Sequence, residues 1–230
     1  MRLLLEELRE IGISKGKLLD VGCGYGWLLK EADSQGFEVF GVEPTQLYKR
    51  LKQRFGHRIV QGFFPSASFP GEAFDVVAAI DVIEHIPIGV LPSFLVGVRD
   101  TLRAGGIFMV KVPDSSGLIF QASAWAHRLT YGLLRSPVNR MLQLDFEFPH
   151  ESYFRQSNLT HYLNSFGFEV VKVMHHPEIS PKTAWNRIKY QHNSSVVARL
   201  GYTVALTCLW GISQVIHKKD ALILFAKVQE

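Results

Sequence analysis

Short runs of hydrophobic residues alternate with amphipathic stretches over the first half of the chain. The runs are almost continuously apolar and stop at glycine, proline or a charged residue, as buried strands do. The stretches between them repeat apolar residues at intervals of three or four, which is typical of one face of a helix. This alternation indicates an α/β fold with a mostly parallel sheet covered on both faces. The predicted strands are 17–21, 37–44, 58–61, 74–80 and 107–112, and the predicted helices are 4–11, 27–35, 45–55 and 88–102.

The pattern changes in the second half of the chain. Apolar residues at helical spacing predict a helix over 118–134, and an irregular stretch rich in phenylalanine follows it. Ser157 is expected to cap the start of another helix. Two further apolar runs, at 168–174 and 221–228, predict the last two strands.

The segment between those last two strands, residues 175–219, is basic and contains an uncharged stretch. It holds six Lys and Arg residues against one acidic residue, Glu178. Within it, 200–216 carries no charge over 17 residues, whereas a membrane-spanning helix needs roughly 20 apolar residues. We therefore expect this stretch not to span a membrane. On a helix it would present a narrow polar stripe made of Thr203, Thr207, Trp210 and Gln214.

Three interpretations of this uncharged stretch are open. It could be a helix buried against its own domain, which is the commoner outcome, or a contact between two copies of the chain. It could also make peripheral contact with a membrane through residues 200–219, because basic residues flank the apolar surface and anionic headgroups favour that combination.

Composition excludes several classes of protein. Of 230 residues, 47% are hydrophobic and 20% are charged, which excludes a disordered or collagen-like chain. The net charge of +4 is too small and too dispersed to indicate nucleic-acid binding. Cys23 and Cys208 lie far apart and predict no disulfide framework, which favours a reducing compartment. The apolar run at the N-terminus is too short for a secretory signal, so we expect a cytoplasmic protein.

A glycine-rich turn follows the first predicted strand. It reads Asp20-Val-Gly22-Cys-Gly24-Tyr-Gly26, and glycines at this place let a ligand approach the backbone closely. The spacing is G-x-G-x-G rather than the G-x-G-x-x-G of nicotinamide-binding domains, because Trp27 holds the last glycine position. Asp20 would repel a pyrophosphate but suits a ligand with a positive amino group.

A second acid, Glu43, ends the second predicted strand. A carboxylate at this point can accept hydrogen bonds from both hydroxyls of a ribose. The structural alternative is that Asp20 caps the following helix and that Glu43 is simply solvated. Because both acids end strands at one edge of the sheet, we favour a ligand site.

Four motifs in order carry a resemblance to a known family. LLDVGCGYG, VFGVEP, FDVVAAIDVIEHI and LRAGGIFMVKVPD resemble the class I S-adenosylmethionine-dependent methyltransferases over residues 17–113. The resemblance continues less tightly through 150–173, where the chain is similar to the branch with ubiquinone-pathway O-methyltransferases and enzymes that modify glycans and small metabolites. It implies S-adenosylmethionine as the cofactor. It also implies a Rossmann-like, doubly wound, seven-stranded sheet with helical insertions, in which the last two strands form an antiparallel pair at one edge.

The resemblance also assigns cofactor-binding residues. The turn residues Asp20, Gly22, Cys23 and Gly24 would face the methionine part of the cofactor, and Glu43 would hold the ribose. Asp81, at the end of the fourth strand, would lie beside the cofactor.

One departure from the family concerns the adenine. Where the family often reads G-D-A after the third strand, this chain reads Gln61-Gly62-Phe63-Phe64. We expect Phe63 to pack against the adenine ring. The alternative is that both phenylalanines belong to the core.

The sequence Asp81-Val-Ile-Glu84-His85 is the leading candidate for the chemistry. On a helical turn all three polar side chains could face one way. His85 could then act as a base, since imidazole exchanges a proton near neutral pH. Alternatively, the group could hold a divalent ion, as the resembled ubiquinone-pathway enzymes do with acid-x-x-Glu-His, or it could be a capping box with Asp81 as the N-cap. His150, which follows a proline, is the second catalytic candidate or a structural hydrogen-bonding group; we assign no metal ligand.

These observations predict a methyltransferase that acts on a small-molecule or glycan acceptor, with oxygen as the expected acceptor atom. The alternatives are a non-catalytic partner that binds the cofactor and a nicotinamide-dependent oxidoreductase. A nucleic-acid methyltransferase is disfavoured, because the fifth strand ends Val-Pro-Asp-Ser rather than D/N-P-P-Y. Arg128, Arg135 and Arg140 could meet an anionic acceptor or form a solvated face.

We expect one domain over residues 1–230. Its cofactor-binding half would be 1–114, a helical lid over the substrate would be 115–149, and the C-terminal half would be 150–230 with the basic and apolar insertion at 175–219.

Overall fold

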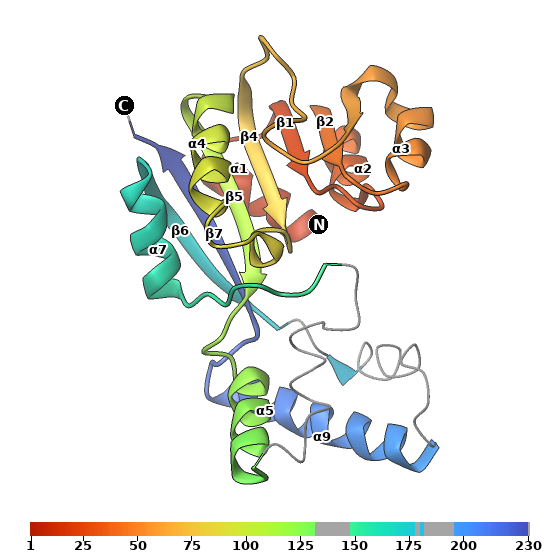
Figure 1. The fold of residues 1–230 in the computed structure, drawn as a ribbon, viewed down its shortest axis with the longest axis vertical. Coiled ribbons are helices and arrows are strands. Elements are labelled where there is room, and N and C mark those ends of the chain that lie inside the picture. Colours follow the sequence, from red (N-terminus) through yellow and green to blue (C-terminus); the bar gives the residue numbers. More distant parts are fainter. Residues whose placement is uncertain (132–147, 178–179, 182–195, 230) are drawn as a thin grey trace.

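A seven-stranded sheet forms the centre of the computed structural model, which describes residues 1–131, 148–177, 180–181 and 196–229 (Figure 1). The strand order is β3-β2-β1-β4-β5-β7-β6. The first five strands are parallel, and β7 runs antiparallel to both β5 and β6. The predicted Rossmann-like fold is therefore confirmed, with β6 and β7 as an antiparallel pair at one edge. The strands are β1 Gly16–Val21, β2 Phe37–Glu43, β3 Ile59–Gln61, β4 Phe74–Ile80, β5 Leu102–Pro113, β6 Phe168–His176 and β7 Ala221–Val228.

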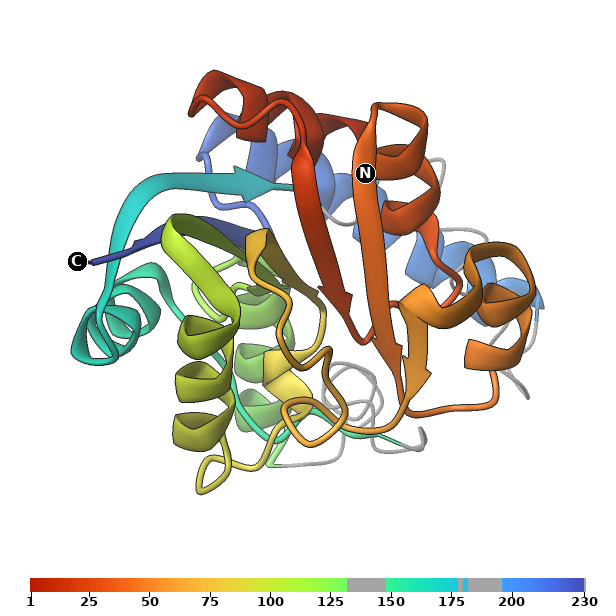
Figure 2. The same ribbon diagram turned by 90° about the horizontal axis from the view of Figure 1, so that it is seen from above.

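Helices cover both faces of this sheet (Figure 2). Successive residues of β4 point to opposite faces, so that Val77 and Ala79 join one core while Val76 and Ala78 join the other. The first core includes side chains from α4 and α7, and the second includes side chains from α1, α2 and α3. Burial on both faces explains why the central strands read as almost continuous apolar runs. The covering helices are α1 Arg2–Glu10, α2 Trp27–Ser34, α3 Tyr48–Phe55, α4 Leu91–Thr101 and α7 Gln156–Ser165.

Two predicted helix starts are wrong for local reasons. α7 begins before Ser157, with Arg155 as its N-cap, and the Asn158 side chain accepts a hydrogen bond from the Arg155 N–H at 2.7 Å. The helix expected from residue 45 begins at Tyr48, because Thr45 belongs to a turn in which its backbone and hydroxyl both bond to Glu43.

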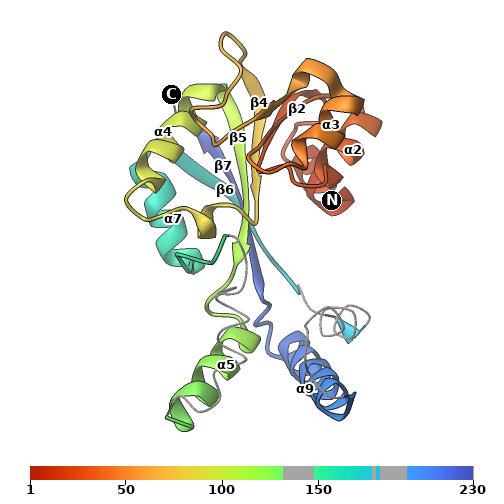
Figure 3. The same ribbon diagram turned by 45° about the vertical axis from the view of Figure 1, so that its right-hand side comes forward.

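Two further helices leave the layered part of the molecule (Figures 1 and 3). α5 Leu118–Leu129 follows β5, and α9 Val196–Val215 precedes β7. A short neck around Asp114 and Asp220 joins these two helices to the sheet. In it, the Asp114 N–H donates to the carbonyl of Asp220 at 2.8 Å. In the part of the chain that the structure describes, no helix is long and apolar enough to cross a membrane, as predicted for 200–216. Residues 132–134 of the predicted helix, together with Arg135 and Arg140, lie outside the described residues.

Candidate active site

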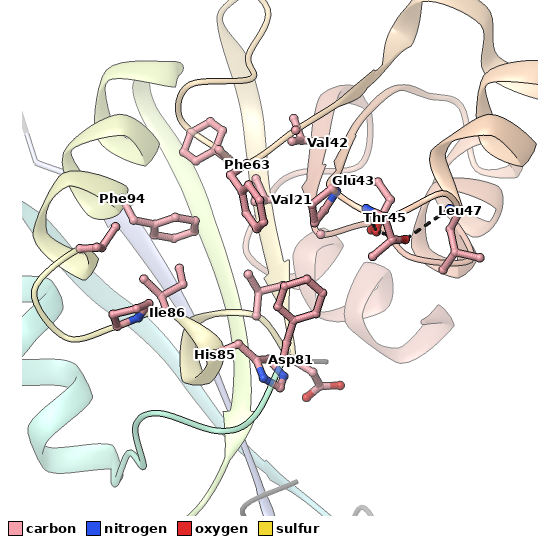
Figure 4. Close-up of a pocket in the computed structure, with 18 of the residues that line it drawn as sticks. Val21, Val42, Glu43, Thr45, Leu47, Phe63, Asp81, His85, Ile86 and Phe94 are labelled. Carbon is pink, nitrogen blue, oxygen red and sulfur yellow. Dashed lines mark hydrogen bonds between the residues drawn. The ribbon is translucent and has the colours of Figure 1, made fainter. Parts of the chain in front are cut away.

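A cavity of about 720 Å³ opens at the carboxyl ends of β1, β2 and β4 (Figure 4). Its walls come from the glycine turn, the end of β2 with the turn after it, residues 62–64, residues between 81 and 94, and Phe148. Open α/β sheets bind their ligands at this edge, and the volume suits a ligand of cofactor size. The lining side chains are mainly apolar, and they include Val21, Val42, Leu47, Phe63, Phe64, Val82, Ile86, Val90, Phe94 and Phe148.

The glycine turn brings bare backbone to the cavity wall. Gly22, Gly24 and Gly26 have φ angles of 69°, 50° and 69°, in the left-handed region that favours glycine. A Cβ atom at Gly22 would lie 2.7 Å from Cγ2 of Val82, closer than carbon atoms can pack. The turn is therefore shaped as a close-fitting cradle.

Glu43 is fixed in the cavity wall by three hydrogen bonds. Its Oε2 accepts from the N–H of Gly24 at 2.8 Å. Its Oε1 accepts from the N–H and the hydroxyl of Thr45 at 2.9 and 2.6 Å, and these two residues lie side by side in Figure 4. The residue is 4% exposed, so the alternative of a solvated Glu43 is wrong. A carboxylate has about four acceptor positions, so these three hydrogen bonds leave about one position for a hydroxyl of a ligand. The cradle, the fixed carboxylate and the volume together fit the adenosyl cofactor that the resemblance implies.

Asp20 and Cys23 lie behind this wall rather than in it. Asp20 is 3% exposed, and its burial, with the nearby charge of Glu43, raises its pKa to about 8. Cys23 packs in the core, and a Cβ atom at Gly41 would lie 2.8 Å from its sulfur. Burial also raises the pKa of the Cys23 thiol, so its side chain is an inert part of the core. The N-cap of α2 is Gly26, so the interpretation of Asp20 as a helix cap is wrong.

The two neighbouring phenylalanines have different surroundings. Phe63 is 66% exposed and lines the cavity, with its ring centroid 6.3 Å from that of Phe148. Phe64 is 9% exposed and packs against Phe94 at 5.5 Å. The interpretation of both as core residues is therefore wrong for Phe63, which has a ring face available to a ligand.

The predicted common face of Asp81, Glu84 and His85 is not formed. A three-residue 3₁₀ turn, η2 Ile83–His85, replaces the expected helical turn, and its N-cap is Val82. The capping-box interpretation is wrong for the same reason. Asp81 has a left-handed φ of 56°, lines the cavity and pairs with Nζ of Lys111 at 2.6 Å. Its carboxylate is thus held by β5 rather than by its own turn.

His85 meets His150 instead. The N–H groups of Glu151 and Ser152 donate to the carbonyl of Glu84 at 2.7 and 3.0 Å, which ties the His150 segment to η2. The two imidazole rings lie 4.8 Å apart, edge to face. Sequence separation hides this contact, because 65 positions divide the two histidines.

The proton on His85 can be placed from one contact. Nδ1 of His85 lies 3.1 Å from the carbonyl oxygen of Pro149, which can accept but cannot donate. Nδ1 therefore carries a proton and donates it to that carbonyl, which leaves Nε2 as the ring's proton acceptor. His85 also lines the cavity.

The buried carboxylate of Glu84 completes a group of three. One possible ligand atom from each of Glu84, His85 and His150 lies within 4.8 Å of the others, so the group could also hold a divalent cation. Burial and the charge of Glu84 raise the pKa of the Tyr153 hydroxyl to about 12. That hydroxyl lies 3.2 Å from Nδ1 of His150.

The structure therefore brings together only some of the predicted site residues. Among the predicted residues, Gly22, Glu43, Phe63, Asp81 and His85 line the cavity. His150 sits beside His85, whereas Asp20, Cys23 and Gly24 support the wall from behind. The sequence reasoning missed the partners Thr45, Lys111, Pro149 and Tyr153; the hydroxyl residue two places after Glu43 was a recognisable signal for Thr45.

Known proteins resemble this chain in sequence. A family model described as a methyltransferase domain matches residues 1–173. The ubiquinone biosynthesis O-methyltransferase of Paramagnetospirillum magneticum is 34% identical over 116 residues, covering 47% of this chain and 43% of that protein. The sterol 24-C-methyltransferase of Yarrowia lipolytica is 36% identical over 112 residues, covering 44% of this chain and 29% of that protein. The matched part of the chain spans less than half the length of these relatives.

A solved structure resembles the chain in fold. It is a mycolic acid cyclopropane synthase complexed with SAH and CTAB, with a TM-score of 0.66 and 17% identity, covering 98% of this chain and 83% of that chain. At this identity the likeness shows the fold alone. The family match disfavours the nicotinamide-dependent oxidoreductase, in agreement with the glycine spacing. Taken with the cradle at Gly22 and the fixed Glu43, it shows that the chain belongs to the methyltransferase-domain family, among the class I S-adenosylmethionine-dependent methyltransferases.

Proposed function

We propose that this protein transfers a methyl group from S-adenosylmethionine to a hydroxyl oxygen of a small molecule, with His85 as the base. The observation that carries the proposal is the hydrogen bond from Nδ1 of His85 to the carbonyl of Pro149, which leaves Nε2 as the basic nitrogen of a residue that lines the cavity. The relatives' names divide between oxygen and carbon acceptors, so the argument for oxygen rests on this imidazole.

The cofactor would be held by the residues around the cradle. Glu43 would accept a hydrogen bond from a ribose hydroxyl, and Phe63 would stack on the adenine. Gly22 and Asp81 would lie beside the methionine part. Asp20 would supply negative charge behind the turn. Cys23 and Gly24 would take part through the backbone that shapes the turn. When bound, S-adenosylmethionine supplies a methyl carbon that is already activated by a sulfonium.

The protein's own part in the chemistry would be alignment, exclusion of water and transfer of one proton. His85 would take the hydroxyl proton on Nε2 while Pro149 keeps Nδ1 protonated. His150, packed edge to face on His85, would orient the ring and contact the acceptor. A charged His85 would be stabilised by the carboxylate of Glu84 nearby.

The acceptor's class follows from the cavity walls. Ile86, Val90 and Phe94 give the cavity an apolar side, which suits a hydroxylated molecule with an apolar body better than a glycan. The relatives named for ubiquinone biosynthesis and for a sterol agree with that choice. The lid expected over 115–149 stays a prediction, because residues 132–147 lie outside the described residues. The protein would be cytoplasmic, with peripheral membrane contact through 200–219.

The test is transfer of a labelled methyl group from S-adenosylmethionine to a panel of phenols with apolar substituents and a panel of sugars. Replacing His85 by Ala should lower kcat by about 10²–10⁴-fold with little change in cofactor affinity. His161→Ala, which changes an exposed histidine on α7, is the matched control and should keep full activity.

Three outcomes would contradict the proposal. Normal turnover by the His85→Ala variant would show that His85 is not the base. Loss of activity on chelation, restored by a divalent cation, would favour the metal interpretation of Glu84, His85 and His150. Cofactor binding without transfer to any acceptor would favour a non-catalytic partner.

A further inference from the structure

The exposed side of α9 is apolar. Each residue of this helix that the structure describes as exposed has a hydrophobic or small side chain or none. Val204 and Val215 are 62% and 78% exposed. Helices on the surface of a globular protein normally turn charged or polar residues to solvent. The exposed residues are Leu200, Gly201, Val204, Ala205, Cys208, Ile212 and Val215.

The polar residues of α9 lie on its less exposed side. Ser213 is 0% exposed, and its hydroxyl donates to the carbonyl of Trp210 at 2.7 Å and accepts from Gln214 at 3.1 Å. Thr203 and Thr207 are partly buried. The polar stripe therefore faces away from solvent while the apolar side faces it, which is the reverse of an ordinary surface helix. Among the described residues, the apolar face of 200–216 is therefore exposed and not buried against its own domain.

α5 contributes a similar surface. Trp125, Leu129 and the following Tyr131 are 58%, 70% and 98% exposed, and Arg128 is exposed beside them. Tryptophan and tyrosine are favoured where one end of a side chain is apolar and the other is wet, as at a membrane–water boundary. We call α5 and α9, with the residues that follow them to Tyr131 and Lys219, the helical pair.

The charge of the helical pair favours one of its two possible partners, a membrane surface, over the other, a second copy of the chain. No Asp or Glu occurs in residues 115–131 and 196–219. Asp114 and Asp220, which flank these two segments, lie in the neck. The same two segments contain Arg128, Arg199, Lys218 and Lys219. A second copy would bring like charges together, whereas an anionic surface would meet opposite charge.

We propose that the helical pair docks on the surface of a bilayer that contains anionic lipid. The exposed faces of α5 and α9 enter the boundary between headgroups and acyl chains, and the basic residues contact the headgroups. α5 follows β5 at the same sheet edge that holds the cavity, so docking brings that edge close to the membrane (Figure 3). The proposal stands independently of methyl transfer, because it rests on the surface of the helical pair alone.

The experiment is flotation of the full chain with vesicles of phosphatidylcholine mixed with phosphatidylglycerol, and with vesicles of phosphatidylcholine alone. The wild type should float with the mixed vesicles, float much less with the neutral ones, and detach at high salt. The double variant Val204→Glu/Val215→Glu should lower the bound fraction at least about tenfold. Its matched control, Leu3→Glu/Val96→Glu, adds the same charge at side chains 37% and 36% exposed on α1 and α4, and should bind like the wild type.

A second measurement follows the surface directly. Tryptophan emission should shift to shorter wavelength on addition of the mixed vesicles, and Trp125→Phe should remove part of the shift. Both double variants should keep the wild-type melting temperature, since the changed side chains are exposed.

Three results would overturn the proposal. The first is equal flotation of the Val204→Glu/Val215→Glu variant and the wild type. The second is failure of the folded wild type to bind the mixed vesicles. The third is self-association without vesicle binding that the same variant abolishes, which would assign the surface to a second copy.

Discussion

The layered sheet and the helical pair place the same kinds of side chain on opposite sides. In the sheet, Leu224 of β7 is completely buried, whereas Leu200 of α9 is 52% exposed. The sheet buries the carboxylates of Asp20 and Glu43, one behind the wall of its ligand cavity and one in that wall, while the helical pair has no carboxylate in its described segments. The difference teaches that hydrophobic residues in one chain can serve two ends. In the sheet they stabilise the fold, whereas in the helical pair they form an exposed surface, for which we propose docking on a membrane.

The largest expected effect compares two leucines. Leu224→Ala should lower the free energy of unfolding by about 2–5 kcal/mol, because it leaves a cavity in the core. Leu200→Ala should change it by no more than about 0.5 kcal/mol. Urea denaturation of the two variants checks this contrast. A large loss for Leu200→Ala would mean that α9 is part of the folded core, and the comparison would fail.

A smaller effect compares two glycines. Gly22→Ala should lower the free energy of unfolding by about 1–3 kcal/mol, since alanine is strained at a φ of 69° and its Cβ would crowd Val82. Gly201→Ala has open space around it in a helix, so it should raise that free energy by up to about 1 kcal/mol. Denaturation with and without S-adenosylmethionine would sharpen the contrast, because Gly22→Ala alone should also weaken cofactor binding. Equal effects of the two changes would contradict the cradle.

A third contrast concerns the ionisation of a buried carboxyl group in the sheet. Asp20 has a pKa of about 8 in the fold against an ordinary value of 3.8, so between these pH values the folded state holds a proton that the unfolded chain has lost. The stability of the ligand-free protein should therefore fall as pH rises from about 4 to about 8. Asp20→Asn should remove that part of the slope and raise the melting temperature more at pH 8 than at pH 5.

The raised pKa of Asp20 also predicts a proton release when the ligand binds. A cationic ligand near Asp20 favours the ionised carboxylate, so binding below pH 8 should release a proton. Calorimetry of wild type in buffers of different ionisation enthalpy would detect the release, and Asp20→Asn should lack it. A wild-type melting temperature that rises from pH 5 to pH 8 in step with Asp20→Asn would contradict the assignment.

Local pattern predicted the sheet well, and long-range contacts limited the rest. The predicted strands 74–80 and 221–228 match β4 and β7, because continuous apolar runs between glycine or charged residues leave little choice. The predicted start of α7 was wrong, because Asn158 accepts a hydrogen bond from the Arg155 N–H and the helix therefore begins before Ser157.

In the site, too, features set by local sequence could be predicted and long-range contacts could not. Glu43 and Asp81 could be placed at strand ends from the sequence, because parallel strands bring their carboxyl ends to one edge. The contact of His85 with Pro149 could not be predicted, as the two residues are 64 positions apart and meet through a loop. The polar stripe of α9 was visible in the sequence, yet its inward direction depends on how the helix sits at the neck.

The most direct test of the account is calorimetric titration of the wild type and Glu43→Ala with S-adenosylmethionine and with NAD. We expect the wild type to bind one S-adenosylmethionine and no NAD. Glu43→Ala should weaken that binding about 100-fold, because it removes a charge-assisted hydrogen bond to the ribose and loosens the turn that Gly24 and Thr45 share with it. Preference for NAD, or equal affinity of the variant for S-adenosylmethionine, would contradict the claim that this cavity is the cofactor site of a methyltransferase.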